Sequence, residues 1–329
     1  MTVSKLGVIG GGAWGTALAQ VAASGGEHTL LWAREPEVVE SVNSSHENSM
    51  FLAGVKLSRA IRATADIDEL GTCDALLVVT PAQHTRSVLR VLPQNGKPLI
   101  LCSKGMEEST TLLMHAVAKE EQPTSPIAVL SGPTFAHEVA AGMPAAVTFA
   151  IQEEEVGEAL LARIAKPFFR PYLSDDVIGA EIGGAVKNVL AIACGVVEGR
   201  GLGQNARAAL ISRGFAEMTR FGLARGARLE TLAGLSGLGD LVLTCSSTSS
   251  RNFSLGKGLG EGGSAADLLA DKRTVAEGAS TAPVLKRAAE AIGVDMPIVA
   301  AVCDLLGGNA SADEVVERLL ARPLRSENL

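Results

Sequence analysis

One lysine of the chain stands in a helix-like segment that is otherwise small or apolar. The segment EIGGAVKNVLAIACGVVEG carries Lys187 and Asn188 among alanines, valines and glycines. Burial disfavours the charged form of an ammonium group, so it would lower the pKa of Lys187 toward the range of a general acid and base. Gly183 and Gly184, one turn earlier, would allow a cofactor ring or another helix to come close. The alternative is a lysine that reaches solvent from the edge of the helix.

A second polar group follows in the segment LSGLGDLVLTCSSTSSRNFSLG. It holds Asp240 and Thr244 and then, after a Ser/Thr run typical of a helix N-cap, Arg251 and Asn252. A guanidinium fork beside the free N–H groups of a helix start is well matched to a phosphate. This segment therefore predicts an anion site.

Glycines mark a further site in the stretch LGVIGGGAWGTAL. Gly10, Gly12 and Gly15 form a G-x-G-x-x-G pattern between a strand and a helix. Such glycines let backbone N–H groups and the positive helix end approach a pyrophosphate, which predicts dinucleotide binding. The alternative is a tight turn whose glycines serve packing only. Ala13 and Trp14 lie in the same turn, where Trp14 either covers a cofactor or caps the sheet.

The end of the second expected strand, LLWAREPE, bears on which dinucleotide is bound. An NAD-specific fold usually carries an acidic residue there, whereas Arg34 stands at the position expected for a 2′-phosphate. We therefore expect NADP(H) to be accepted. Arginine also stacks on adenine, so NAD(H) stays possible, and the alternative for Arg34 is a solvated surface residue.

Two other strand ends carry residues suited to a ligand. CSKGME would project the ammonium group of Lys104 into the crevice at the carboxyl ends of the strands, where open α/β sheets bind ligands. In SGPTFAHEV, Gly132, Pro133 and Thr134 shape a rigid turn whose backbone can face a small ligand. His137 is interpreted as a surface or supporting histidine, and a solvated Lys104 is the alternative to a functional one.

The elements that must position these residues follow from the apolar pattern. Continuous apolar runs predict buried parallel strands with amphipathic helices between them, at 5–9, 28–33, 74–79, 98–102, 126–130 and 144–150. Helix-like segments replace them at 177–200, 205–226, 277–291, 297–307 and 311–321. The pattern predicts an α/β fold: a Rossmann-like doubly wound sheet in domain 1–176 and an all-helical substrate and catalytic domain in 177–329. We expect the crossing at 170–176 and a loop at 258–264.

Composition excludes several classes of protein. The chain has 329 residues, 47% hydrophobic content and a net charge of −7, which argues against disorder and against general nucleic-acid binding. The apolar runs are too short to predict a membrane span, and no signal peptide is expected. Five scattered cysteines and five scattered histidines predict neither disulfides nor a metal site, and they fit a cytoplasmic protein.

The chain resembles the bacterial NAD(P)-dependent glycerol-3-phosphate dehydrogenase family over its whole length. The resemblance rests on eight blocks in order: GGGAWGTAL, CSKGME, SGPTFAHEV, GAVKNVLAIACGV, GQNARAALISRGFAEM, LSGLGDLVLTC, SSRNFSLG and VAEG. It implies reversible hydride transfer between NAD(P)H and dihydroxyacetone phosphate, which gives sn-glycerol 3-phosphate for phospholipid synthesis. It also implies a homodimer.

The resemblance assigns roles by position. Lys187 matches the catalytic proton donor and acceptor, and Lys104 matches a contact to substrate and cofactor. The other substrate-binding matches are Gly132, Thr134, Asp240, Ser250, Arg251 and Asn252. The cofactor-binding matches are Ala13, Trp14, Arg34, Ala136, Arg251, Val275 and Glu277. Many members have Ser and Tyr or Phe where this chain has Ala13 and Trp14.

The chemistry of ketone reduction agrees with these roles. Arriving hydride places negative charge on the ketone oxygen, which needs a proton donor and fixed positive charge, and Lys187 and Lys104 can supply them. We expect Asp240, Asn188 and Thr244 to complete the catalytic group, with Asp240 and Asn188 orienting the lysine and the substrate hydroxyls, and no metal to be required. Reduction of 6-phosphogluconate-type, 3-hydroxyacid or ketopantoate substrates, or a dinucleotide sensor without turnover, are the alternatives.

Overall fold

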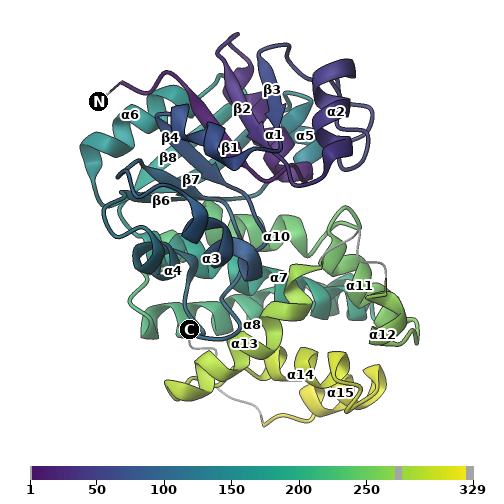
Figure 1. Cartoon of the computed structure of the whole chain (residues 1–329). Helices are drawn as coiled ribbons and strands as arrows, with labels where there is room; N and C mark the ends of the chain where they lie inside the picture. The colour runs from purple at the N-terminus through teal and green to yellow at the C-terminus, as the bar shows by residue number, and fades with distance from the viewer. Residues whose placement is uncertain (1, 271–275, 324–329) are drawn as a thin grey trace. The chain divides into compact units, whose positions relative to one another are not determined.

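The computed structural model describes residues 2–270 and 276–323, and its first part is built on one eight-stranded sheet (Figure 1). The strand order is β3-β2-β1-β4-β5-β6-β7-β8. The strands are β1 (Leu6–Ile9), β2 (Thr29–Trp32), β3 (Ile61–Thr64), β4 (Ala75–Val78), β5 (Leu99–Leu101), β6 (Ile127–Ser131), β7 (Ala145–Ala150) and β8 (Phe169–Ser174). The apolar runs become buried central strands, as in the fully buried BBBB pattern of β1 and β4.

Helices connect the strands and cover the sheet. They are α1 (Ala13–Ala23), α2 (Pro36–Ser45), α3 (Ala82–Val91), α4 (Met114–Glu121), α5 (Ala136–Ala140) and α6 (Glu154–Ile164), with a 3-10 turn η1 (Ile67–Thr72). From β1 the chain winds toward β3, and from β4 it winds the other way toward β6. Right-handed crossovers therefore place α1 and α2 on one face and α3 and α4 on the other. The predicted doubly wound sheet is confirmed.

The sheet differs from the predicted one at its two ends. β3, with sequence IRAT, was not predicted, because one exposed arginine interrupts its apolar pattern. The segment expected as the crossing instead forms most of β8, an edge strand that tolerates Pro171 because only one side of an edge strand is paired. β7 runs antiparallel to β6, so the expectation that all strands are parallel was wrong. The chain reverses there through short α5 and a turn at Gly142, whose φ is +77°.

Two compact units make up the chain, and one of them is discontinuous in sequence. The first comprises residues 1–103 and 114–180, and the second comprises residues 104–113 and 181–329. The described part of the second unit is helical apart from an isolated bridge between Met106 and Leu113. The helices that follow the sheet are α7 (Val177–Gly199), α8 (Gly203–Ala224), α9 (Leu229–Leu232), the π-helical turn η2 (Leu235–Gly239), α10 (Asp240–Thr244), α11 (Arg251–Gly260), α12 (Ala265–Leu268), α13 (Glu277–Ala291), α14 (Pro297–Leu306) and α15 (Ala312–Leu320).

The segment 258–264, expected as a loop, begins inside a helix. Its first residues form the last turn of α11, which ends at Gly260. Gly260 is needed there because a Cβ would lie 2.6 Å from the Val196 carbonyl oxygen of α7. The expected loop is therefore confirmed for 261–264, where Gly262 has φ +97°, and is wrong for 258–260, where the chain is still helical.

α7 as a whole is long and apolar enough to cross a bilayer by length and composition, although its continuous apolar run is short. Its mean hydropathy reaches 1.5 over the best window. However, 94% of that window is buried inside the protein, as in the core helix of a folded domain.

Glycines bring α7 and α11 into backbone contact. A Cβ at Gly195 would lie 2.1 Å from the Phe253 carbonyl oxygen, and a Cβ at Gly256 would lie 1.9 Å from that of Ile192. Real Cβ atoms do not approach a carbonyl oxygen so closely. The contact therefore fixes where α11 begins relative to α7, and with it the place of Arg251.

The substitution Gly256→Ala tests this contact. The added methyl group must push the helices apart, and overpacking of this kind costs roughly 1–3 kcal/mol. We expect a lower midpoint of urea unfolding. Gly258→Ala, in the same helix, is the matched control, because its Cβ would meet only the movable end of the Leu268 side chain. Equal losses for both variants would contradict the packing argument.

Candidate active site

Lys187, Asp240, Thr244 and Lys104 form one connected polar group in the second unit. Lys187 Nζ donates to Asp240 Oδ1 at 2.8 Å and to Thr244 Oγ1 at 2.9 Å. Lys104 Nζ donates to the other carboxylate oxygen, Asp240 Oδ2, at 2.6 Å. Thr244 Oγ1 lies 3.2 Å from Asp240 Oδ1. The carboxylate of Asp240 thus holds two ammonium groups at once.

Close packing of backbone positions this group. Gly183, one turn before Lys187 on α7, lies against η2, where a Cβ would be 2.2 Å from the Ser236 carbonyl oxygen. η2 leads directly into α10, whose first residue is Asp240 and whose last is Thr244. Gly183 was expected to allow a cofactor ring or another helix to come close, and in the structure the helical turn η2 lies against it.

The electrostatics of the group follow from its burial. Lys187 is 6% exposed and Asp240 is fully buried. Burial lowers the pKa of Lys187 to about 8, although Asp240 opposes the change. Burial also raises the pKa of the Asp240 carboxyl. The nearby positive charges of Lys104 and Lys187 lower it by more, so the pKa of Asp240 lies below its ordinary value. The site therefore keeps a carboxylate beside a lysine that can exchange a proton near neutral pH.

Two buried asparagines link three helices next to this group. Asn252 Nδ2 donates to Asn188 Oδ1 at 2.9 Å, and Asn252 Oδ1 accepts from the backbone N–H of Gly278 at 2.9 Å. Asn188 follows Lys187 on α7, but its side chain bonds to Asn252 rather than to the lysine. Gly278 was not recognised from the sequence, since its contribution is a backbone N–H group.

The start of α11 has the features of an anion site. Ser250 is its N-cap, and the Ser250 hydroxyl accepts from the backbone N–H of Phe253 at 3.2 Å. The first N–H groups of a helix have no partner within the helix. Arg251 follows with an exposed side chain, and no hydrogen bond or ion pair joins its guanidinium to a residue within 2–270 or 276–323. The capping bond uses the oxygen of Ser250, and its hydroxyl proton is left to donate.

The glycine turn of the first unit fits a pyrophosphate. Gly10 has φ +122°, and a Cβ at Gly15 would lie 1.9 Å from the Gly10 carbonyl oxygen, so both positions require glycine. Gly12 is different, because a Cβ there would meet nothing within 4 Å. Gly12 is also the N-cap of α1, with no side-chain cap and no acidic residue in the first turn. Open space therefore faces uncapped N–H groups at a positive helix end.

Trp14 and Arg34 lie near this turn. The Trp14 Nε1 atom is buried and has no hydrogen-bond partner among the described residues. Trp14 and Ala13 are partly buried and both pack against the apolar core of this unit. Arg34 is exposed and pairs with Glu35, Nη2 to Oε1 at 3.1 Å. Glu35 was not singled out from the sequence, although its place about 20 residues after Gly15 is the signal that could have identified it.

The turn after β6 carries the remaining first-unit residues. Gly132 must be glycine because a Cβ would lie 2.8 Å from Val147 Cα of β7. Thr134 Oγ1 donates to the Gly132 carbonyl oxygen at 3.3 Å, and Ala136 begins α5. His137 is exposed and stacks on Phe135, which agrees with its interpretation as a surface residue. Glu277 begins α13 in the second unit, while Val275 lies outside the described residues.

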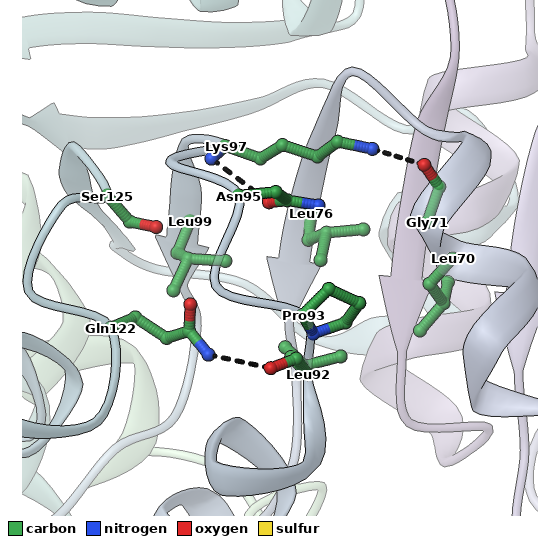
Figure 2. Close-up of a pocket in the computed structure, with 10 residues that line it drawn as sticks. All are labelled: Leu70, Gly71, Leu76, Leu92, Pro93, Asn95, Lys97, Leu99, Gln122 and Ser125. Atoms are coloured by element: carbon green, nitrogen blue, oxygen red, sulfur yellow. Dashed lines mark hydrogen bonds between the residues drawn. The ribbon is translucent and has the colours of Figure 1, made fainter.

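The hollow in Figure 2 lies at the amino-terminal ends of β4 and β5, whereas the turns after β1, β2 and β6 follow the carboxyl ends of their strands. It is lined by Leu76 and Leu99, at the amino-terminal ends of β4 and β5, and by the buried Gln122, whose Nε2 donates to the Leu92 carbonyl oxygen at 3.1 Å. Open α/β sheets bind their ligands at the carboxyl ends of the strands. We therefore place no function in this hollow. Within 2–270 and 276–323, no three His, Cys, Asp or Glu side chains gather as a metal site.

Comparison with known proteins covers nearly the whole chain. A family model described as the N-terminus of NAD-dependent glycerol-3-phosphate dehydrogenase matches residues 5–157, and one described as its C-terminus matches residues 176–317. A glycerol-3-phosphate dehydrogenase of the NAD(P)+ type from Erythrobacter litoralis is 66% identical over 99% of this chain and 98% of its own length. One from Novosphingobium aromaticivorans is 63% identical over 98% of each chain.

A solved structure has the same fold. The crystal structure of glycerol-3-phosphate dehydrogenase from Coxiella burnetii is 35% identical and superposes with a TM-score of 0.93, over 97% of this chain and 99% of that one. The relatives and this structure all extend over both units.

Proposed function

We propose how the site of this chain works from the premise that the chain belongs to the NAD-dependent glycerol-3-phosphate dehydrogenase family. The protein is an NAD(P)-dependent oxidoreductase that reversibly reduces dihydroxyacetone phosphate to sn-glycerol 3-phosphate. The observation that carries the mechanism is the buried Lys187 ammonium, held between Asp240 and Thr244.

The glycine turn fits the cofactor. The space that a Cβ at Gly12 would fill, and the uncapped N–H groups beside it, suit the pyrophosphate, and Arg34 suits a 2′-phosphate. Ala13, Ala136, Glu277 and Trp14, whose buried Nε1 has no hydrogen-bond partner in the described part of the chain, are proposed as further contacts. When bound, the nicotinamide supplies or accepts the hydride.

Lys187 is proposed as the general acid and base. In the reduction direction its Nζ gives a proton to the ketone oxygen as negative charge develops there, and in the oxidation direction it takes the hydroxyl proton. Asp240 fixes the lysine and holds Lys104, which contributes a second positive charge. Thr244 provides the other bond that fixes Nζ.

The phosphate of the substrate is proposed to lie at the start of α11. Arg251 provides an exposed guanidinium fork, Ser250 a hydroxyl proton, and the first turn its N–H groups. Asn188 and Asn252 hold α11 against α7, which fixes the distance between this anion site and Lys187. Gly132 and Thr134 are proposed as further substrate contacts.

The pH dependence should differ in sign between the two directions. Reduction needs protonated Lys187, so kcat/KM for dihydroxyacetone phosphate should be flat at low pH and fall about tenfold per unit above its pKa of about 8. Oxidation needs the neutral amine, so kcat/KM for glycerol 3-phosphate should rise through the same value. Initial rates between pH 6 and pH 10 in both directions measure this. Profiles that bend in the same direction would contradict the assignment.

One assay tests the proposed function. NADPH oxidation is followed at saturating dihydroxyacetone phosphate and, separately, with ketopantoate and a 3-keto acid. NADP+ reduction is followed with 6-phosphogluconate. Turnover with dihydroxyacetone phosphate alone supports the proposal. Turnover with another substrate replaces it, and cofactor binding without any turnover would indicate a sensor.

The setting of the enzyme is also a proposal. A dehydrogenase that makes sn-glycerol 3-phosphate would supply the backbone of glycerophospholipids. The five free cysteines suit a reducing cytoplasm, and the family resemblance supports a homodimer. Light scattering of the purified protein tests the dimer.

A further inference from the structure

Asn48 is a fully buried amide that joins the loop after α2 to the glycine turn of the first unit. Its Nδ2 group donates to the Gly11 carbonyl oxygen at 2.7 Å and to the Thr16 hydroxyl of α1 at 2.8 Å. Its Oδ1 accepts from the backbone N–H of Phe51 at 3.1 Å. Both amide protons and the amide oxygen are therefore used. A carboxylate, a hydroxyl or an apolar side chain lacks the groups for these three bonds.

The bond to Gly11 fixes the direction of the N–H group that follows it. The peptide between Gly11 and Gly12 is trans, so its C=O and its N–H point in opposite directions. Asn48 holds the carbonyl oxygen toward the interior, and Thr16 Oγ1 donates to the same oxygen at 3.4 Å. The N–H of Gly12 therefore points away from the interior. In the described part of the chain, no group accepts a hydrogen bond from it.

The turn needs such support because it consists of glycines. Gly10, Gly11 and Gly12 follow one another, and glycine adopts backbone conformations that other residues avoid. If the peptide between Gly11 and Gly12 rotated, its carbonyl oxygen would take the place of its N–H and would repel an anion. An N–H that is already oriented binds an anion more tightly, because less free energy is spent on ordering the turn.

We propose that Asn48 is a positioning residue for dinucleotide binding, which acts through Gly11 and holds the N–H of Gly12 toward the pyrophosphate. Asn48 is buried and does not touch the cofactor itself. The pyrophosphate is common to NADH and NADPH, so the loss of Asn48 should weaken both cofactors equally. This inference rests on the proposed function only in taking the ligand to be a dinucleotide.

Equilibrium binding of NADPH and NADH, followed by nicotinamide fluorescence, tests the proposal without any substrate. Asn48→Ala should raise the Kd of both cofactors by about tenfold, because the turn loses its main hydrogen-bond donor. In the assay with dihydroxyacetone phosphate, KM for NADPH should rise in parallel. The value of kcat at saturating NADPH should stay within roughly twofold, since the bound pyrophosphate then holds the turn.

Asn43, near the end of α2, provides the matched control. Its amide also bonds one backbone C=O and one backbone N–H, both of Ala63 in β3, at 3.0 Å and 2.9 Å. Asn43→Ala should therefore lower the midpoint of urea unfolding, as Asn48→Ala does. Both Kd values should nevertheless stay within about twofold of those of the unsubstituted protein, because Asn43 does not bond to the glycine turn.

Thr16 tests the same support without removing the asparagine, which matters if Asn48→Ala does not fold. Thr16→Val keeps the shape of the side chain but removes the hydroxyl that links Asn48 to the Gly11 carbonyl oxygen. It should raise the Kd of both cofactors by about threefold. Thr16→Ser keeps the hydroxyl and should bind both cofactors nearly as well as the unsubstituted protein.

The outcomes separate this inference from the proposed function. Equal losses for NADH and NADPH in Asn48→Ala and Thr16→Val, absent from Asn43→Ala and Thr16→Ser, support the positioning role. Unchanged affinities, a loss confined to one cofactor, or the same loss in Asn43→Ala overturn it even if dihydroxyacetone phosphate is reduced. If the supporting pattern occurs in a protein that does not reduce dihydroxyacetone phosphate, the positioning role stands and the substrate assignment fails.

Discussion

Replacing Lys187 with methionine should lower kcat for dihydroxyacetone phosphate reduction by about 10²-fold or more, the usual loss for a general acid. Methionine fills a similar volume, so the buried position stays packed. Asp240 keeps Lys104 and Thr244 as partners, so its carboxylate is not left alone. Cofactor affinity, measured by fluorescence, should stay near that of the unsubstituted protein.

Two further results distinguish a chemical role of Lys187 from a structural one. The residual activity of Lys187→Met should no longer change through pH 8, because the titrating group is gone. Lys286→Met is the matched control, since this lysine of α13 is partly exposed and pairs with Glu290. If Lys187→Met retains turnover within a few-fold, Lys104 or a water molecule must donate the proton.

Arg251→Ala should cost several kcal/mol in kcat/KM for dihydroxyacetone phosphate. A guanidinium fork makes two charge-assisted bonds to one phosphate, each contributing roughly 1.5–3 kcal/mol. The net charge of −7 opposes binding of a dianion, so recognition depends on this local cation. Part of the loss should appear in kcat, because a held phosphate keeps the carbonyl in line for hydride transfer.

Dihydroxyacetone, which lacks the phosphate, provides the decisive comparison for Arg251. The unsubstituted enzyme should use it very poorly, and Arg251→Ala should be hardly worse. Arg213→Ala, which removes an exposed arginine of α8, controls for the lost charge. Equal damage with both substrates would mean that Arg251 serves the cofactor or the fold instead of the phosphate.

The parts of the fold that the sequence predicted are those with strong local signals. Continuous apolar runs gave the central strands, and the long helices α7 and α13 begin where their patterns begin. β3 and β8 could not be predicted this way, because edge strands are buried on one side only and their patterns contain Arg62, Arg170 and Pro171. The direction of β7 depends on the turn that precedes it, which its own residues do not encode.

The candidate site was predicted as residue types but not as an arrangement. Lys187 was recognisable because one ammonium in an apolar helix is unusual. The expectation that Asp240 orients this lysine came from the chemistry of the reaction and not from a local pattern. The bond between Lys104 and Asp240 was not expected, since the two residues are 136 positions apart and meet only through tertiary packing. The bond between Asn188 and Asn252 likewise depends on backbone contact between α7 and α11 at glycines. Glycine spacing predicts that another segment of the chain packs closely, but it does not predict which segment.

The discontinuity of the second unit limits how this enzyme can be recombined. Residues 104–113 belong to that unit although they precede α4 in the chain, and they supply Lys104 to Asp240 as well as the Glu108 carbonyl oxygen that accepts from Arg287. A chimaera joined once near residue 176 would combine this insert from one parent with the helical residues of the other. The two residues of each bond, Lys104 with Asp240 and Glu108 with Arg287, would then come from different parents. A graft that preserves the ion pair must instead transfer residues 104–113 together with residues 181–329.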